Sequence, residues 1–238
     1  QNEIFVANFA NSTLSVISGA TNTVVAEIPV PMGPAEVAYD PANGSIFVSD
    51  YDSSSVTVVN DTNNSIVAIV PVGTQPIGVV FDSMESEVWV ANFGSNNVTV
   101  LSSRDYVRAA NITVGVEPYS AAYVENQNQV WVTNFGSANV TAISDTNFMI
   151  VAWVAVGLAP VGIAFAYDTT RVYVSNYQSN NVTAISDIDY DVLANIAVGE
   201  EPSFLNYENG SEQIFVPNEA STNVTVISDV TDSTVANI

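Results

Sequence analysis

The 238-residue chain contains no lysine, histidine or cysteine, and only three arginines. Without histidine or cysteine, thiol chemistry, imidazole bases, disulfides, thiolate–zinc sites and histidine-ligated haem are excluded within this chain. Without lysine there is no Schiff-base chemistry. Arg104, Arg108 and Arg171 cannot form the basic field that binding to phosphates needs, so no nucleic-acid partner is expected.

Long hydrophobic runs are also missing. The longest, such as residues 149–156, fall far below the roughly 18 residues that suggest a membrane span, so we expect none in this chain. The chain begins at Gln1 without a basic-then-apolar leader, and we therefore expect a mature or trimmed product.

What the chain does contain is acid and hydrophobic residues. It has 25 Asp and Glu and a formal charge of −22, yet 47% of its residues are hydrophobic and its mean hydropathy is +0.25. A disordered acidic chain would be poor in apolar and aromatic residues, so this composition predicts a globular protein with a large core.

An internal repeat of 42 residues runs through the whole sequence without insertion or deletion. The segment IFVANFANSTLSVIS starts at Ile4, and its relatives include VWVANFGSNNVTVLS from Val88 and VYVSNYQSNNVTAIS from Val172. The six repeats start at residues 4, 46, 88, 130, 172 and 214, and we expect them to form one domain over residues 1–238. A proline recurs at the same step at Pro34, Pro76, Pro118, Pro160 and Pro202.

Each repeat predicts four short strands. In the third, residues 78–81, 87–91, 97–101 and 109–114 are rich in β-formers and are separated by turns of Gly, Asn, Ser and Asp. No segment keeps a helical period. A period of about 42 residues with four strands predicts an all-β fold, a six-bladed β-propeller with four antiparallel strands per blade. An aromatic that recurs at the 42-residue step is expected to pack between blades, at Tyr39, Phe81, Tyr123, Phe165 and Tyr207.

The recurring V-[YWF]-V-[TAS]-N, N-V-T-V-I-S and V-G-x-x-P blocks resemble the YVTN-type β-propeller repeat of archaeal surface-layer and related secreted proteins. The resemblance covers the whole chain, and it implies the fold more specifically than the function, because the matching residues build the blade. The sixth repeat departs from the pattern with Pro217 and Glu219. Pro217 removes a backbone donor, so this strand is expected to be imperfect or at an edge.

Six repeats need more residues than the chain has. Ile238 aligns with Ile28, so the segment equivalent to residues 34–40 is missing from one blade, and 23 strands are expected in place of 24. Three explanations stay open: absent C-terminal residues, a longer polypeptide with more blades or a stalk, or a strand donated by a neighbouring subunit, since an unpaired edge favours β-augmentation.

The most frequent modification motif is N-x-[S/T], the acceptor for N-linked glycans. It occurs about twice as often as composition alone predicts. Four copies share one repeat position, where Asn also suits the turn, and six lie outside that register, so the pattern predicts an extracellular glycoprotein. The candidate sites are Asn11, Asn43, Asn60, Asn63, Asn97, Asn111, Asn139, Asn181, Asn209 and Asn223.

Two other groups of polar residues are candidates for ligand contact. One residue per blade, at the corner between strand and turn, favours a structural role over a ligand rim: Asn8, Asp50, Asn92, Asn134, Asn176 and Asn218. Asp187, Asp189 and Asp191 start like a calcium loop, but Val192 stands where the EF-hand requires glycine. A solvated loop is the favoured interpretation, calcium is the alternative, and no cofactor is otherwise expected.

The sequence offers little support for a catalytic function. A Ser–His–Asp triad is excluded by the absence of histidine, and a pair of carboxylates acting on a glycosidic bond remains formally open. No acidic residue is expected to interrupt the repeat within a strand that faces the channel. We therefore expect a protein that is not an enzyme.

The excess of acidic over basic residues indicates the kind of medium in which the protein works. Carboxylates without lysine partners repel one another at neutral pH, whereas at pH about 2–3 most would be neutral, because carboxyl pKa values lie near 4. We hypothesise an acidic or cation-rich medium. A comparison of melting temperatures at pH 3 and pH 7 tests it, and clearly greater stability at pH 7 would contradict it.

The sequence as a whole predicts a structural or adhesive protein of the extracellular cell surface, archaeal by resemblance and glycosylated. It would present rigid rims and assemble with a protein partner, itself included, into a layer or filament. The alternative is a lectin-like module that binds glycans or another protein, and the third candidate is a carboxylate-dependent glycosidase. Because the repeats are nearly identical, the sequence alone does not reveal which differences between blades serve a function.

Overall fold

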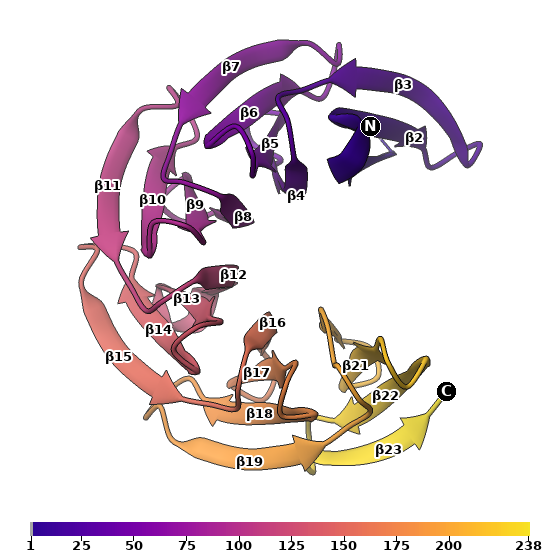
Figure 1. Cartoon of the computed structure of the whole chain (residues 1–238), viewed down its shortest axis with the longest axis vertical. Helices are drawn as coiled ribbons and strands as arrows, with labels where there is room; N and C mark the ends of the chain where they lie inside the picture. Colours follow the sequence, from indigo (N-terminus) through magenta and orange to yellow (C-terminus); the bar gives the residue numbers. More distant parts are fainter. Residues whose placement is uncertain (1) are drawn as a thin grey trace. The chain divides into compact units, whose positions relative to one another are not determined.

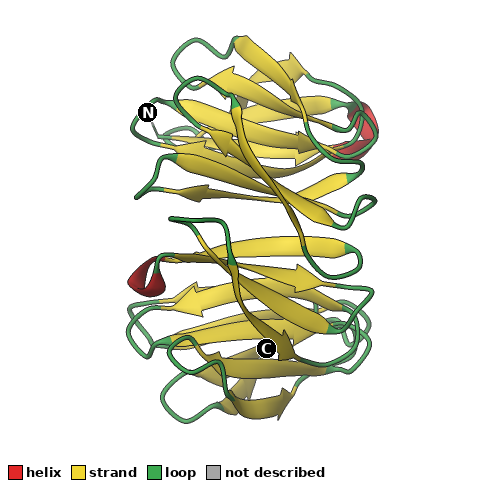
Figure 2. Ribbon diagram, turned by 90° about the vertical axis from the view of Figure 1, so that its left-hand side faces the viewer, coloured by secondary structure: helices red, strands yellow, loops and turns green. Residues whose placement is uncertain are grey.

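The structure, a computed structural model, describes residues 2–238. The chain divides into two compact units, residues 1–113 (unit 1) and 114–238 (unit 2), each built from three antiparallel sheets (Figure 1). Nearly every segment of both units is strand or short loop (Figure 2). The helical segments among residues 2–238 are two three-residue turns, η1 (Phe9–Asn11) and η2 (Glu125–Gln127).

The strands of unit 1 follow one another in space in chain order. The first sheet consists of β1 (Glu3–Asn8), β2 (Thr13–Ser18) and β3 (Thr23–Pro29). The second consists of β4 (Pro34–Asp40), β5 (Ser45–Asp50), β6 (Ser55–Asn60) and β7 (Ile66–Pro71). The third consists of β8 (Pro76–Asp82), β9 (Glu87–Asn92), β10 (Asn97–Ser102) and β11 (Arg108–Thr113).

Unit 2 repeats this arrangement with four strands in each sheet. Its first sheet consists of β12 (Pro118–Val124), β13 (Gln129–Asn134), β14 (Asn139–Ser144) and β15 (Ile150–Ala155). The second consists of β16 (Pro160–Ala166), β17 (Arg171–Asn176), β18 (Asn181–Ser186) and β19 (Val192–Ala197). The third consists of β20 (Asn206–Glu208), β21 (Gln213–Asn218), β22 (Asn223–Ser228) and β23 (Ser233–Asn237).

These sheets confirm the predicted fold class, all-β with six propeller blades. Residues 2–238 form 23 strands, as expected, and the sheet that lacks its inner strand is β1–β3, where β1 pairs with β2 alone. The four strands predicted for the third repeat are each observed within two residues of their expected ends. The assignment of all six blades to a single domain stays a prediction.

The prediction for the strand that carries Pro217 is wrong: β21 lies between two partners and pairs with β22 along all six of its residues, and the irregular strand of the sixth blade is its inner neighbour β20. Each complete inner strand spans seven residues, for example β16, whereas β20 spans three. Before β20 the chain is held to β21 by a bridge between Pro202 and Asn218 and by the Ser203 N–H, which donates to the Pro217 carbonyl at 2.9 Å. The inner edge of this blade is therefore loop rather than regular strand.

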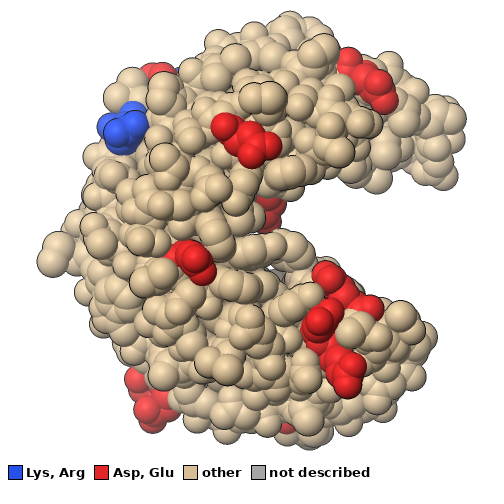
Figure 3. All heavy atoms as spheres, in the orientation of Figure 1, with Lys and Arg blue, Asp and Glu red and all other residues tan. Residues whose placement is uncertain are grey.

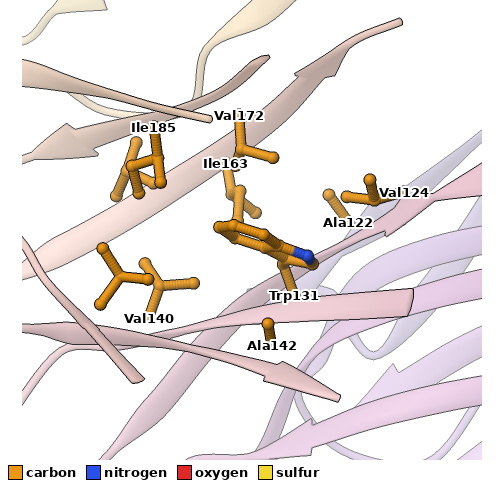
Figure 4. Close-up of a cluster of buried hydrophobic side chains, with 10 residues drawn as sticks. Ala122, Val124, Trp131, Val140, Ala142, Ile163, Val172 and Ile185 are labelled. Atoms are coloured by element: carbon orange, nitrogen blue, oxygen red, sulfur yellow. The ribbon is translucent and has the colours of Figure 1, made fainter. Parts of the chain in front are cut away.

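The hydrophobic cores lie between neighbouring sheets. In unit 2, Trp131 of β13 is fully buried against Ile163, Val172 and Ile185 of the adjacent sheet (Figure 4). The Trp131 indole N–H donates to Gln129 Oε1 at 2.9 Å, so the ring is buried without leaving its donor unpaired. Corresponding cores join sheets β16–β19 and β20–β23, and in unit 1 they join β1–β3 to β4–β7 and β4–β7 to β8–β11.

Three of the five recurring aromatics, Phe81, Phe165 and Tyr207, pack against cores between sheets, as predicted. Tyr39 is instead 47% exposed beside β1, because that sheet has no inner strand to cover the ring. Among residues 2–238, no helix has the length and apolar character needed to cross a membrane.

Candidate ligand-binding pocket

The recurring corner residues are part of the scaffold. In the third sheet the Asn92 Nδ2 donates to Asn97 Oδ1 at 2.8 Å and to Thr99 Oγ1 at 2.9 Å. The same pattern recurs at Asn134, Asn176 and Asn218, all of which are buried. These bonds tie the end of one strand to the next strand, in agreement with a structural role for these residues.

The glycine of the VGxxP block contacts these corners. A Cβ on Gly115 would lie 2.5 Å from Asn134 Cγ, a distance that no side chain tolerates without displacement of the corner. The same close approach is found between Gly157 and Asn176 and between Gly199 and Asn218. The repeated glycine is therefore a packing requirement and not a ligand cradle.

The ten sequon asparagines fall into two groups in the structure. Four are half-buried, and their Oδ1 atoms accept the hydrogen bond from the corner asparagine: Asn97, Asn139, Asn181 and Asn223. Five are exposed, at Asn11, Asn43, Asn63, Asn111 and Asn209. Asn60 is half-buried, and its Oδ1 accepts from the backbone N–H groups of Thr62 and Asn63.

The three aspartates of the DIDYD segment do not converge. Asp187 is buried at the end of β18, whereas Asp189 and Asp191 are exposed in the loop that follows. Burial raises the pKa of the Asp187 carboxyl. Within residues 2–238, no group of three or more carboxylates is placed to hold a metal ion.

Glu36 corrects the expectation that no acidic residue interrupts the repeat within an inner strand. It lies in β4, and its carboxylate accepts a hydrogen bond at 3.2 Å from the Val79 N–H of the neighbouring β8. Burial raises the pKa of Glu36 to about 7, and the bond from Val79 opposes this shift. The sequence already contained the signal, because the equivalent residues of later repeats are Gly78, Ser120, Gly162 and Phe204. The observed contact of Glu36 joins two inner strands.

The most distinctive cavity of unit 2 has a volume of about 340 Å³. Aromatic rings dominate its wall, together with one carboxylate, and they come from all three sheets of the unit: Tyr119, Phe135, Val161, Tyr177, Ser203, Phe204 and Glu219. The ring of Tyr119 lies 6.0 Å from that of Phe135 at an interplanar angle of 29°, and 5.9 Å from that of Phe204 at 40°. Phe204 is 49% exposed, so an aromatic face is available to a ligand.

The backbone beside Phe204 is positioned by a close approach of two sheets. A Cβ on Gly162 of β16 would lie 2.9 Å from both the Phe204 Cα and the Ser203 carbonyl oxygen. The Ser175 hydroxyl donates to that same Ser203 carbonyl at 2.6 Å. A glycine and a short hydroxyl side chain thus hold the loop before β20 against β16, with the Phe204 ring at the cavity.

Residues that break the repeat converge on this pocket. Phe204 stands where other blades have Gly, Ser or Glu, and Tyr119 stands where they have Ala35, Ile77, Val161 and Ser203. Glu219 replaces an aromatic that every other blade carries, at Phe9, Tyr51, Phe93, Phe135 and Tyr177. The departures are far apart in sequence, and the fold brings them together in one wall.

A second cavity of about 280 Å³ shares Tyr177 with the first and adds Glu200 and Glu201 to the surroundings. The pKa of the Tyr177 phenol is raised, first because its hydroxyl donates to the Glu201 carboxylate, with the charges of Glu201 and Glu219 also contributing. Figure 3 shows carboxylate side chains gathered over this end of sheet β20–β23. We name the two adjoining cavities together the aromatic–acidic pocket.

Unit 1 has a smaller cavity of about 230 Å³ beside β1. It is lined by Glu3, Phe5, Val37, Tyr39, Ile46 and Asp61. The Tyr39 hydroxyl donates to Asp61 Oδ2 at 2.9 Å, and this bond raises the pKa of the phenol. The cavity adjoins β1, which pairs with β2 alone among the described strands.

Comparisons with known proteins show the fold and leave the family open. A structure from Desulfotomaculum acetoxidans, of a protein described as functionally unknown, is 13% identical with a TM-score of 0.87, over the whole of this chain and 80% of the other. Dihydro-heme d1 dehydrogenase NirN, solved in complex with DHE, is 17% identical with a TM-score of 0.79. This chain is matched in full there, but it spans only 53% of NirN.

Hydrazine synthase of Kuenenia stuttgartiensis is 16% identical with a TM-score of 0.64, over 97% of this chain and 93% of the other. These similarities are to multi-blade β-propeller proteins and establish a propeller fold. No family model matches the chain. No curated protein matches it either.

Proposed function

We propose that this chain is a non-enzymatic, adhesive β-propeller of the extracellular cell surface, related to the YVTN-type repeat proteins of archaeal surface layers. It holds a partner in the aromatic–acidic pocket and presents that pocket on a rigid scaffold. The observation that carries the proposal is the convergence of Tyr119, Phe204 and Glu219, three departures from the repeat, on one wall. Residues that only build blades follow the repeat, whereas residues that bind a ligand are free to depart from it.

The experiment that tests this function uses the folded chain on glycan and peptide arrays. Wild type is compared with Phe204→Gly, which restores the residue found in two other blades, and with Phe9→Ala, a matched control that removes an exposed aromatic from unit 1. We expect retention on one array that falls at least tenfold in Phe204→Gly and is unchanged in Phe9→Ala. Equal retention of all three proteins would refute the pocket as the binding site.

A lectin-like function is the second candidate, and the unit 1 cavity favours it. The side chains of Phe5 and Tyr39 beside Glu3 and Asp61 combine ring faces with carboxylate acceptors, a combination that suits sugar hydroxyls. Glycan binding that is lost in Tyr39→Ala and kept in Phe204→Gly would assign the lectin activity to unit 1.

Glycosylation at the exposed sequons is part of the proposal and is expected to follow exposure. In a host that attaches N-linked glycans, we expect occupancy at Asn11, Asn43, Asn63, Asn111 and Asn209 and none at the four half-buried sites that accept corner hydrogen bonds. A glycan on those four would require the corner bonds to break. Glycopeptide mapping by mass spectrometry measures the occupancy, and modification at Asn97 or Asn139 in the folded protein would contradict the structural role of these residues.

A further inference from the structure

The aromatic–acidic pocket offers carboxylate acceptors and ring faces, and two backbone donors beside it are already engaged. The backbone N–H groups of Ser203 and Glu219 donate to the carbonyls of Pro217 and Glu201, at 2.9 Å and 3.0 Å. An anion would meet the carboxylates of Glu200, Glu201 and Glu219 in this pocket.

The negative charge of the pocket is not neutralised from within its own unit. Residues 114–238 carry fourteen carboxylate side chains and a single basic residue, Arg171. Arg171 is committed elsewhere: it pairs with Asp232 at 3.5 Å and donates to the Asp229 carbonyl. The pocket therefore presents Glu200, Glu201 and Glu219 to solvent without a cation of unit 2 to balance them.

The other blades do not carry carboxylates at the positions equivalent to Glu200 and Glu219. At the repeat position of Glu200 the earlier blades have Met32, Thr74, Val116 and Leu158, and at that of Glu219 they have an aromatic. Two carboxylates thus enter the sixth blade at positions that are otherwise uncharged. They enter beside the rings of Tyr119, Tyr177 and Phe204.

We propose that the aromatic–acidic pocket binds the guanidinium group of an arginine side chain on a partner protein. The inference rests on the proposed binding function and names its ligand. A guanidinium is planar, stacks on aromatic faces and forms paired hydrogen bonds with a carboxylate. The Phe204 and Tyr119 rings supply the faces, and the carboxylate of Glu219 lies in the same wall.

The test compares two probes that differ in charge and hardly in shape, N-acetyl-L-arginine methylamide and N-acetyl-L-citrulline methylamide. Each is titrated into the folded chain at pH 7, and the aromatic proton signals are followed by NMR. We expect the arginine probe to shift pocket signals saturably, with a Kd at least tenfold lower than that of the citrulline probe. Glu219→Tyr, which restores the residue that two other blades carry, and Phe204→Gly should each weaken binding at least tenfold, and Phe9→Ala should not.

Two results would overturn this inference. Equal affinity for the two probes would show that charge does not decide recognition, and the absence of any saturable shift would show that the pocket does not accept a guanidinium. If either of these results were found and array retention still depended on Phe204, the pocket would have a binding function, but its ligand would not be a guanidinium group. Absence of array retention by the wild-type protein would instead refute the binding function itself.

Discussion

Replacing Trp131 with alanine is expected to lower the free energy of unfolding by about 3–5 kcal/mol, the usual cost of removing a buried tryptophan. The ring is fully buried between sheets β12–β15 and β16–β19, and its N–H donates to Gln129. The variant loses the packing of the ring, opens a cavity between two sheets and leaves the Gln129 amide oxygen without this donor. Urea unfolding followed by circular dichroism measures the loss.

Trp153→Ala is the matched control, because this second tryptophan of the same sheet is 51% exposed. Its removal leaves no enclosed cavity, and we expect a change below about 1 kcal/mol. A similar destabilisation by both substitutions would show that the core between these sheets does not dominate the stability of unit 2.

Asp50→Asn is expected to stabilise the protein at neutral pH by roughly 3 kcal/mol, at about 1.4 kcal/mol for each pKa unit. Asp50 is fully buried, and burial raises its pKa to about 6, opposed by hydrogen bonds from Thr57 and Ser55. The folded state holds the proton more tightly than the unfolded state. The stability contributed by neutral Asp50 is therefore complete below pH about 4 and is lost as the pH rises through about 6.

Asparagine fits this corner because another blade already uses it there. Asn8 stands at the equivalent position, and its Nδ2 donates to Thr13 Oγ1 and Ser15 Oγ, the counterparts of Ser55 and Thr57. The gain from Asp50→Asn should be present at pH 7 and small at pH 3.5, as measured by urea unfolding at both values. Asp105→Asn, at an exposed loop position, is the control, and a gain of equal size at both pH values would exclude burial of the Asp50 charge as its cause.

The carboxyl pKa shifts act in both directions: hydrogen bonds lower the pKa values of the exposed Asp105, Asp189 and Glu208, which favours neutral pH, whereas three buried carboxyls favour acid. Glu36, Asp50 and Asp187 all bind protons more tightly in the folded state because they are buried. Each contributes stability that is complete at low pH and declines as the pH rises through its folded pKa. The melting temperature at pH 3 and pH 7 remains the direct measurement of the sum.

Most of the fold could be predicted because the information is periodic. A repeat of 42 residues presents the same four strands six times, so the β-formers, turns and prolines of one blade support the assignment of the next. The missing inner strand was predictable for the same reason, by counting. The exposure of Tyr39 could not be predicted from its own blade, because it depends on a strand that is missing from the neighbouring blade.

The pocket could not be predicted in this way. Tyr119 and Glu219 are separated by two full repeats and more, and nothing in their local sequence shows that they share a wall. Glu36 differs from this case, because the column of Glu, Gly, Ser, Gly and Phe at its repeat position was visible in the sequence. Repeat alignment therefore reveals which residues depart, and only the three-dimensional arrangement reveals which departures act together.

Because every core lies between two sheets, the middle sheet of each unit belongs to two cores at once. Sheet β4–β7 shares one with β1–β3 and one with β8–β11, and β16–β19 does the same in unit 2. A middle sheet cannot open without exposing both of its faces to water. Amide hydrogens in β5 and β17 should therefore exchange through opening of the whole unit, and their exchange rates report its cooperative stability and not the fraying of one blade.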